Sequence, residues 1–493
     1  MNSAVVLYRP EDLGSVEICA IAAGAQVEIA SELDKRLASI RTEMLAALKV
    51  AHPVYGVTTG MGASSDLALN TEQQRAHQGR LMLARQVGTA PWFNVETVRA
   101  GLAARLRTFL NGDAGVSPAL CHALVDFLNA GLTPAVPESS HGAAGEIIPL
   151  AHVGGALSGI GEVLVDTEAV PRASRKADEV LPGKGISPHT FGPKEGIAML
   201  QGTPLAIGAA LLLADEVGNH IRQHLLITAT AVAMTGASRD PYDPALARGD
   251  LELQRVLEDL QRLLPSQSSR TASLQAPVSF RVTPSALAHT QRVTGQLKDA
   301  AERVLLGVND SPAFVQGRFI GTATFDGFAL AAGFDALRVA VLHLGELSAA
   351  RLHRLLDSRF SNRPPQLSAE PGAQAGLVAV HKGAVGILHR ILTEAAPSSL
   401  GLRETSLGQE DAQSFTLEAF SAAQRALDGV RRVLASELLA LVHAERLEPA
   451  GAGQRATEDL VSFADEVVSP GVEDRPFGGD IAALTQLLKG RPS

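Results

Sequence analysis

The interpretation of this chain depends on the stretch Ser140-His141-Gly142-Ala143-Ala144-Gly145-Glu146-Ile147-Ile148-Pro149-Leu150-Ala151-His152. It follows a turn marked by Pro134 and Pro137, and it leads into an apolar run with helical character. Two glycines with only alanine between them predict a tight turn, where one backbone segment closely approaches another. The sequence around this turn indicates which kind of site the turn belongs to.

The composition is typical of a globular protein with a large core. Of the 493 residues, 46% are hydrophobic and 19% are charged, which argues against a disordered chain. The length allows either several domains or one large helical assembly. The formal net charge is −9 and no basic run is present, so we do not expect nucleic acid as a partner.

Cysteine usage and the apolar runs indicate the compartment. The two cysteines, Cys19 and Cys121, favour a reduced compartment over a disulfide framework. The first residues lack a basic leader followed by an apolar core. The longest apolar run, Leu205 to Ala214, is much shorter than the ~20 residues that a membrane span needs. We therefore expect a soluble, cytoplasmic protein with no membrane partner.

Hydrophobic periodicity predicts an all-α fold with long bundled helices, because period-2 strand patterns are nearly absent. We divide the chain into an N-terminal domain (1–200), a central helical bundle (201–450) and a C-terminal helical segment (451–493). A polar loop is expected at 172–192. The ranges with helical patterning are 73–110, 118–130, 205–235, 244–264, 284–306, 326–357, 376–395 and 411–446.

A glycine-rich loop, Tyr55-Gly56-Val57-Thr58-Thr59-Gly60-Met61-Gly62, precedes the central stretch. Its three glycines break any regular element. Taken alone, Tyr55 is interpreted as a tyrosine that packs a turn. Taken alone, Arg281, at the end of Gln275-Ala276-Pro277-Val278-Ser279-Phe280-Arg281, is interpreted as a surface charge.

Several blocks in this order resemble the aromatic amino acid ammonia-lyase and aminomutase family, which includes the histidine, phenylalanine and tyrosine lyases. The resemblance runs from about residue 50 to about residue 420, and any single block would be a weak signal. It implies a long central helix bundle of the fumarase and aspartase architecture. It also implies a homotetramer in which each active site draws on three chains. The further blocks are Gly192-Pro193-Lys194-Glu195-Gly196, Gln201-Gly202-Thr203, Gln316-Gly317-Arg318-Phe319-Ile320-Gly321 and Gly408-Gln409-Glu410-Asp411.

The resemblance implies roles for individual residues. Tyr55 is expected to be the base that removes the Cβ proton of the substrate, Arg281 to bind the substrate carboxylate, and Glu410 to point into the active site. A guanidinium suits a carboxylate because its donors bind both oxygens. A phenol with an ordinary pKa near ~10 needs nearby positive charge to act as a base at neutral pH.

The central stretch departs from the family. In the family, an Ala-Ser-Gly triplet cyclises into an electrophilic methylidene-imidazolone group, and here the triplet is Ala143-Ala144-Gly145. Gln201 and Arg318 stand where the family has asparagine, and Val278 stands where it has a second active-site tyrosine. In the family those positions line or support the prosthetic group, whereas the residues that serve the substrate are retained here. We therefore expect an enzyme without the prosthetic group, and no other cofactor.

Two further cations and a histidine pair are candidates. Arg85 lies where the family places its residues for side-chain selectivity, and Lys382 falls on a helix whose family counterpart faces the active site. The alternative for each is a solvated helix charge. His220 and His224 have a spacing that suits zinc, but no third ligand follows nearby, so we expect no metal.

Loss of the electrophile changes the expected substrate. Ammonia is a poor leaving group, whereas a trimethylammonium group departs as neutral trimethylamine. The resemblance is greatest to the ergothionase branch of the family, which eliminates trimethylamine from ergothioneine. We expect a carbon–nitrogen lyase acting on ergothioneine or a related betaine, with Lys382 and Glu410 contacting the imidazole or thione. Two alternatives remain open: an aromatic ammonia-lyase whose serine was engineered to alanine, and a catalytically inactive relative that acts as a binding or scaffolding subunit.

Overall fold

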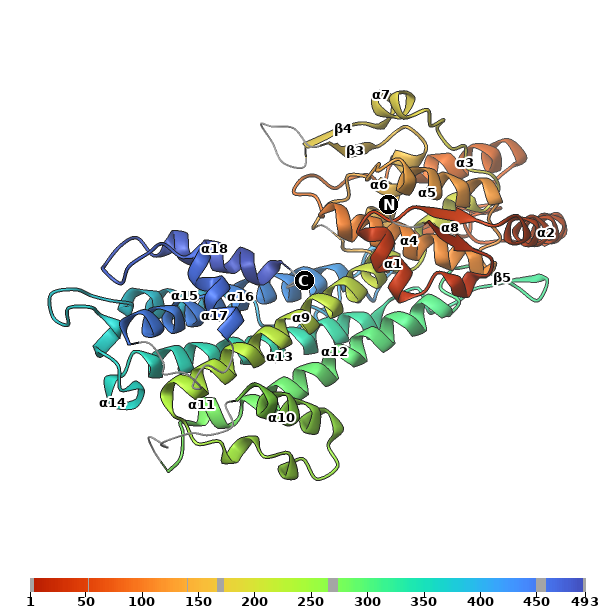
Figure 1. Cartoon of the computed structure of the whole chain (residues 1–493). Helices are drawn as coiled ribbons and strands as arrows, with labels where there is room; N and C mark the ends of the chain where they lie inside the picture. The colour runs from red at the N-terminus through yellow and green to blue at the C-terminus, as the bar shows by residue number, and fades with distance from the viewer. Residues whose placement is uncertain are drawn as a thin grey trace. The chain divides into compact units, whose positions relative to one another are not determined.

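Helices dominate the chain (Figure 1). The structure is a computed structural model, and it describes residues 4–51, 53–139, 141–165, 173–264, 274–448 and 458–490. Ser140 of the central stretch, residue 172 of the predicted polar loop, and residues 451–457 of the predicted C-terminal segment lie outside the described residues. The predicted all-α fold class is confirmed.

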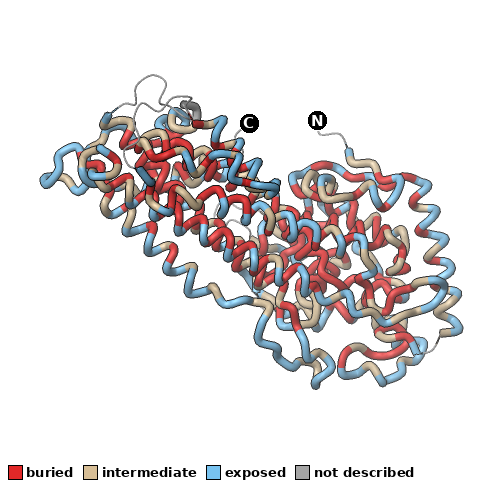
Figure 2. Tube along the Cα trace, turned by 90° about the horizontal axis from the view of Figure 1, so that it is seen from below, coloured by how far each residue is buried: buried red, intermediate tan, exposed pale blue. Residues whose placement is uncertain are grey.

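Four long helices of 24 to 32 residues coincide, within a few residues, with predicted ranges. Alanine and leucine, which are good helix formers, are abundant in them. The four helices are α9 (Pro204–Thr235), α12 (Thr283–Leu306), α13 (Phe328–Leu355) and α16 (Thr416–Leu447). Buried and exposed residues alternate at helical spacing along α12 and α13, whereas most residues of α9 and α16 are buried; Figure 2 colours the chain by burial.

The shorter helices correct one prediction. The range 73–110 is divided into two helices, because residues 84–94 contain Gly88 and Pro91, and a proline cannot donate a helical hydrogen bond. The shorter α-helices are α1 (Ser15–Ala22), α2 (Ser31–Leu48), α3 (Thr71–Leu83), α4 (Val95–Asn111), α5 (Pro118–Asn129), α6 (Ile147–Leu157), α7 (Ala177–Val180), α8 (Glu195–Leu200), α10 (Leu251–Leu263), α11 (Val278–Arg281), α14 (Ser358–Ser361), α15 (Val378–Leu392), α17 (Glu458–Val467) and α18 (Gly478–Lys489).

The strands form three two-stranded sheets among the described residues. The predicted loop at 172–192 is wrong in part, because it contains a strand, α7 and a 3-10 turn at Leu181–Lys184. The pairs are β1 (Val5–Leu7) with β2 (Val27–Ile29) in parallel, and β3 (Glu162–Val165) with β4 (Ala173–Lys176) and β5 (Ala313–Val315) with β6 (Arg318–Ile320) in antiparallel orientation.

The chain forms two compact units from interleaved segments. Within unit 1, α4 packs against α1 and α5, and α6 packs against α3 and α8. The predicted domain boundaries at residues 200 and 450 stay predictions. Unit 1 comprises Met1–Leu213, Leu297–Asp335 and Pro397–Ser421, and unit 2 comprises Ala214–Gln296, Ala336–Ala396 and Ala422–Ser493.

A buried ion pair links helices in unit 2. The Nε and Nη2 atoms of Arg351 on α13 donate to the two carboxylate oxygens of Glu437 on α16, at 2.7 and 2.8 Å. The Nη1 atom of Arg351 donates to Thr283 Oγ1 at the start of α12, at 2.8 Å. Both charged side chains are fully buried, so the two-point geometry is what makes burial of the charges tolerable.

Two apolar segments, Glu195–Thr235 and Phe328–Leu355, are long and apolar enough to cross a membrane. Most of each apolar window is buried inside the protein. The core helices of a soluble protein pass the same test of length and composition, so the two segments are weak evidence for a span.

Candidate active site

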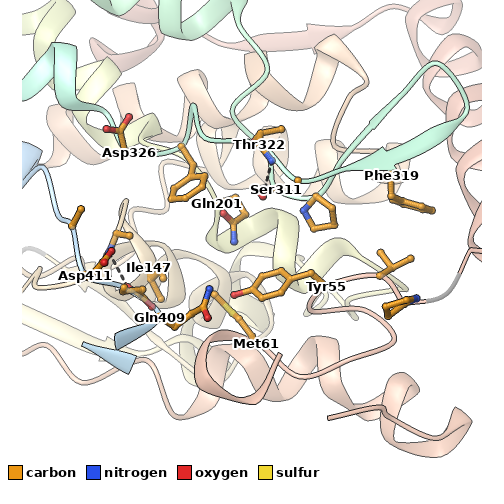
Figure 3. A pocket seen from close by; sticks show the side chains of 18 residues that line it. Tyr55, Met61, Ile147, Gln201, Ser311, Phe319, Thr322, Asp326, Gln409 and Asp411 are labelled. Carbon is orange, nitrogen blue, oxygen red and sulfur yellow. Dashed lines mark hydrogen bonds between the residues drawn. The ribbon is translucent and has the colours of Figure 1, made fainter. Parts of the chain in front are cut away.

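A pocket with a volume of about 630 Å³ lies in unit 1 beside the central stretch (Figure 3). Ala144 and Ile147 line it from that stretch, while Tyr55 and Glu410 line it from two loops. In Figure 3, the side chains of Tyr55 and Gln201 point toward the middle of the pocket. The other lining residues are Pro53, Val54, Met61, Ser311, Pro312, Phe319, Gly321, Thr322, Phe325, Asp326, Gln409, Asp411 and Ala412.

The loop that carries Tyr55 folds back on its own backbone. Gly56 and Gly62 have φ values of +65° and +62°, which glycine adopts readily. A Cβ atom at Gly56 would lie 2.9 Å from the side chain of Ile197. The N–H of Gly62 donates to the phenol oxygen of Tyr55 at 2.9 Å. The loop sequence therefore fixes the direction of the tyrosine.

The environment of Tyr55 opposes its ionisation. Burial raises the pKa of the phenol, and the negative charge of Glu410 raises it further. The hydrogen bond from Gly62 and the positive charge of Arg85 lower the pKa, but the net direction is upward. A tyrosine in this position needs more positive charge beside it before it can act as a base.

The central stretch forms the tight turn that its glycines predict. Gly145 has a φ of +76°, and a Cβ atom there would lie 3.1 Å from the carbonyl oxygen of Phe325. The N–H of Ala144 donates to Glu410 Oε2 at 2.9 Å. The turn therefore brings the peptide of Ala144 to the pocket and ties it to a carboxylate.

Glu146 anchors this turn from behind. Its carboxylate accepts hydrogen bonds from the backbone N–H groups of Leu205 and Ala206, at 2.8 and 2.7 Å, at the start of α9. These N–H groups have no partner inside a helix, so the carboxylate caps them. Burial raises the pKa of Glu146 to about 7, although the two backbone bonds act in the opposite direction.

Glu410 is held by its own loop. Its Oε1 atom accepts a hydrogen bond from Ser406 Oγ at 2.9 Å, and its backbone pairs with that of Thr405. Leu407 between them has a φ of +55°, which is unusual for a branched side chain. The tight turn thus turns the carboxylate toward the central stretch.

Gln201 presents an amide to the pocket from the residue before the Gly202 turn. Gln201 is buried, with 8% of its surface exposed, and it lines the pocket. Its backbone carbonyl accepts a hydrogen bond from Arg105. Burial lowers the pKa of that arginine to about 10, while the charges of Glu146 and Asp310 act in the opposite direction.

The charged residues that line this pocket are all acidic. Glu410, Asp326 and Asp411 line the pocket, and none of the described lining residues is lysine, arginine or histidine. A second pocket of about 370 Å³ shares Met61, Ile147 and Glu410 with the first one. Its lining contains Arg85, whose Nη2 lies 3.4 Å from the sulfur of Met61.

Comparison with known proteins identifies the family. The family model described as "Aromatic amino acid lyase" matches residues 13–465. The chain belongs to the aromatic amino acid lyase family. It is 32% identical to the histidine ammonia-lyase of Symbiobacterium thermophilum, with 96% of this chain and 94% of that one covered. It is 31% identical to the tyrosine ammonia-lyase of Cupriavidus metallidurans over the same shares of the two chains.

Solved structures share the fold of this chain. Ergothionase from Treponema denticola, in complex with desmethyl-ergothioneine sulfonic acid, has a TM-score of 0.91 at 22% identity and covers 99% of both chains. Tyrosine aminomutase from Streptomyces globisporus has a TM-score of 0.90 at 24% identity, with 99% of this chain and 97% of that one covered. The ammonia-lyase architecture predicted from the sequence is confirmed.

The residues of this chain do not fit the prosthetic group of its family. Formation of that group removes water from the serine of the triplet, and Ala144 carries a methyl group with no hydroxyl. The N–H of the same residue is engaged by Glu410.

Four of the residues predicted to act on or bind the substrate line neither of the two pockets. Val278, Arg281 and Lys382 belong to unit 2, where Val278 and Lys382 are exposed. The Nε atom of Arg281 is buried and has no hydrogen-bond partner among the described residues. Arg318 is exposed on β6, and its neighbour Phe319 lines the pocket instead. Their roles toward a substrate stay predictions.

The histidine pair is a packing feature in unit 2. The Nε2 atoms of His220 and His224 lie 3.1 Å apart, and both rings are buried. Burial lowers the pKa of His220 to about 3, so the ring is neutral near neutral pH. Within the described ranges, no group of three or more His, Cys, Asp or Glu residues could hold a metal ion.

Several pocket residues escaped sequence reasoning. Phe325 lies in a loop and Ser406 in a short 3-10 turn, and no local signal distinguishes them from solvated residues. Asp326 was placed at the start of the predicted helical range 326–357, but α13 begins at Phe328 and leaves Asp326 in the pocket lining. Met61 belongs to the glycine-rich loop that carries Tyr55, so its place in the pocket lining could have been predicted from the sequence.

Proposed function

We propose that this lyase releases trimethylamine from an aromatic or imidazole amino acid betaine, such as ergothioneine, by β-elimination without a methylidene-imidazolone group. The observation that carries the proposal is the pairing in one pocket of Tyr55 with Ala144, a base beside a position that has no hydroxyl. The hydrogen bond from Ala144 to Glu410 supports an ordinary peptide at this position.

The chemistry follows from the leaving group. The phenolate of Tyr55 takes a Cβ proton, and the electrons of that C–H bond form the Cα–Cβ double bond. The C–N bond breaks, and its electron pair leaves with the nitrogen as neutral trimethylamine. The products are an α,β-unsaturated acid, a neutral amine and a protonated Tyr55. A positioned base of this kind typically contributes about 10²–10⁴-fold to the rate.

The lining of the pocket supports a cationic substrate. Glu410, Asp326 and Asp411 create a negative potential that attracts a cation from solution. The rings of Tyr55 and Phe325 line the same space, and aromatic faces bind quaternary ammonium groups. A trimethylammonium group keeps its charge at every pH, so it also favours ionisation of a neighbouring phenol.

The remaining substrate contacts follow from the family. Arg281 is proposed to bind the carboxylate, and its unpartnered Nε atom suits that role. Lys382 and Glu410 are proposed to contact the imidazole or thione. We propose that a homotetramer brings Arg281 and Lys382 to the pocket from other copies of the chain, and that the enzyme works in the cytoplasm.

The test uses two matched pairs of substrates. Ergothioneine and histidine betaine are incubated with the enzyme in parallel with 2-thiohistidine and histidine, which carry the same rings on a primary amine. Released trimethylamine, released ammonia and the ultraviolet absorbance of the unsaturated product are followed. We expect trimethylamine from at least one betaine and no ammonia from either amino acid, and a background rate with Tyr55→Phe.

Two results would contradict the proposal. Ammonia from histidine or 2-thiohistidine, without trimethylamine, would assign an ordinary ammonia-lyase activity. Tight binding of the substrates, with no product from any of the four, would assign a binding subunit.

A further inference from the structure

Arg85 stands apart from the other cations near the two pockets. It follows the end of α3, and among the described residues it is the only lysine, arginine or histidine that lines either pocket. Its Nη1 donates to the carbonyl oxygen of Leu81 at 3.2 Å, and its Nη2 contacts Met61 Sδ at 3.4 Å. A thioether is a weak acceptor, so this guanidinium is poorly compensated.

The carboxylate of Glu410 does not neutralise the charge of Arg85. Glu410 lines the same small pocket, but its two oxygens accept hydrogen bonds from Ala144 N–H and Ser406 Oγ. Within the part of the chain that the structure describes, Arg85 has no acidic partner within 4.0 Å. A half-buried cation without a paired anion exerts its field on the groups around it.

The backbone connects Arg85 to the phenol of Tyr55. Met61, on which the guanidinium rests, precedes Gly62, whose N–H donates to the phenol oxygen at 2.9 Å. The cation and the phenol are therefore fixed on two consecutive loop residues. The loop cannot hold Tyr55 in this direction without also placing it in the field of Arg85.

We propose that Arg85 is a positioning residue that stabilises the phenolate of Tyr55 and so prepares it to act as the base. The inference rests on the proposed function, because it assumes that Tyr55 takes the proton. It gives Arg85 a role that does not require contact with the substrate. The family resemblance predicts a different role for this position, in substrate selectivity.

The other charged groups around the phenol act against Arg85 or not at all. The negative charge of Glu410 raises the pKa of Tyr55, whereas Arg85 and the Gly62 N–H lower it. Asp326 and Asp411 line the same pocket and have the same sign as Glu410. Burial and the charge of Arg85 both lower the pKa of His77, so this ring is neutral near neutral pH and adds no competing cation.

The composition of the chain permits a direct measurement without substrate. The protein has three tyrosines, Tyr8, Tyr55 and Tyr242. Burial raises the pKa of Tyr242, whose hydroxyl donates to the carbonyl oxygen of Phe280 at 3.0 Å. Tyr8 is 61% exposed and can be replaced by phenylalanine. In the Tyr8→Phe background, tyrosinate absorbance during an alkaline titration reports Tyr55 first.

The experiment compares charge variants on both sides of the phenol. We expect Arg85→Gln to raise the pKa of Tyr55, Glu410→Gln to lower it, and Arg85→Lys to restore most of the wild-type value. Arg80→Gln, which removes an exposed charge from α3, the helix that precedes Arg85, is the matched control and leaves the titration unchanged. With a betaine, Arg85→Gln lowers kcat at neutral pH by about tenfold, less than removal of the base itself, and moves the rise of kcat to higher pH.

The titration separates this inference from the proposed function. An unchanged titration in Arg85→Gln, or a shift in the same direction in Arg85→Gln and Glu410→Gln, would overturn the role of Arg85. A large rise in KM with an unchanged pH profile would instead assign Arg85 to substrate binding, and would also overturn it. The titrations can also behave as expected while no betaine is turned over. In that case the proposed function fails, and the effect of Arg85 on the ionisation of Tyr55 is still supported.

Discussion

Charged residues on the two sides of the central turn differ in their burial and in their partners. Behind the turn, Arg105, Glu146, Lys194 and Asp310 are almost completely buried, with exposed fractions of 2% or less. Each has a partner there: Lys194 pairs with Asp310 and Ala114, Glu146 caps α9, and Arg105 donates to a backbone carbonyl. In front of the turn, Tyr55, Arg85 and Glu410 are half-buried and each lines a pocket.

This difference distinguishes charges that stabilise the fold from charges that can act on a substrate. Fully buried charges are stable only when their partners are close, so this paired layer holds the turn in place. Tyr55 and Arg85 have weaker partners, a backbone N–H and a thioether. Their charges and protons therefore remain available to a substrate.

The largest effect is expected in front of the turn, at Tyr55. The change Tyr55→Phe keeps the ring that packs the loop and removes the group that takes the proton. We expect kcat on a betaine to fall by about 10²–10⁴-fold, with KM within a few-fold of wild type. Steady-state kinetics with trimethylamine detection checks this. Near-normal turnover would move the role of base to Glu410, and the two sides of the turn would no longer differ in the way described.

A large effect on stability is expected behind the turn, at Lys194. Lys194→Met leaves Asp310 buried without its cation, and breaking a buried pair costs about 3–5 kcal/mol. Chemical denaturation measures the loss. Arg175→Gln removes an exposed pair with Glu179 in the same unit, and exposed pairs contribute about 0–1 kcal/mol. Equal losses for the two variants would contradict the assignment of a structural layer.

Glu146 predicts a dependence of stability on pH. Its pKa is raised to about 7 in the folded protein, above the ordinary value of 4.5 that applies when the chain is unfolded. The folded state therefore holds the proton more tightly, and the free energy of unfolding falls as pH rises from 4.5 toward 7, by about 3 kcal/mol. In Glu146→Gln, unfolding measured across this range should lose that slope. An unchanged slope would show that the carboxylate is not the source.

A smaller effect tests whether the front of the turn is completed by other copies of the chain. Tyr55→Phe and Arg281→Met are each expected to be nearly inactive, the second through weakened substrate binding. If the two residues serve one site from different chains, co-expressed mixtures recover about a quarter of the wild-type rate. If a single chain supplies both residues, mixing recovers nothing. The mass of the assembly in solution provides the control, and a monomer would contradict the proposal.

The sequence predicted the front of the turn better than the back. Tyr55 and Glu410 stand in recognisable blocks, and Ala144 is conspicuous because a hydroxyl is missing there. The cap that Glu146 makes on α9 joins residues 59 and 60 positions apart, and no local pattern reveals such a contact. The field of Arg85 at Tyr55 depends on the fold of a glycine-rich loop, which periodicity does not describe.

The helices likewise were predicted well where the sequence has a repeating pattern and less well where it does not. Long periodic segments such as α12 and α13 were predicted within a few residues, because amphipathic burial leaves a repeating signal. The break between α3 and α4 was missed, although Gly88 and Pro91 mark it. Lys382 was expected to face the active site because of its helix's family counterpart. It is exposed within unit 2, so its place beside a substrate depends on assembly.

The claim that elimination proceeds without an electrophilic prosthetic group is tested most directly by chemical trapping. Trimethylamine release from ergothioneine or histidine betaine is measured before and after treatment of the enzyme with borohydride, beside a histidine ammonia-lyase that retains its serine. We predict that the ammonia-lyase loses its activity, whereas this enzyme releases trimethylamine at an unchanged rate. Loss of trimethylamine release after borohydride treatment would contradict the account, because it would reveal an electrophile that Ala143-Ala144-Gly145 is argued not to form.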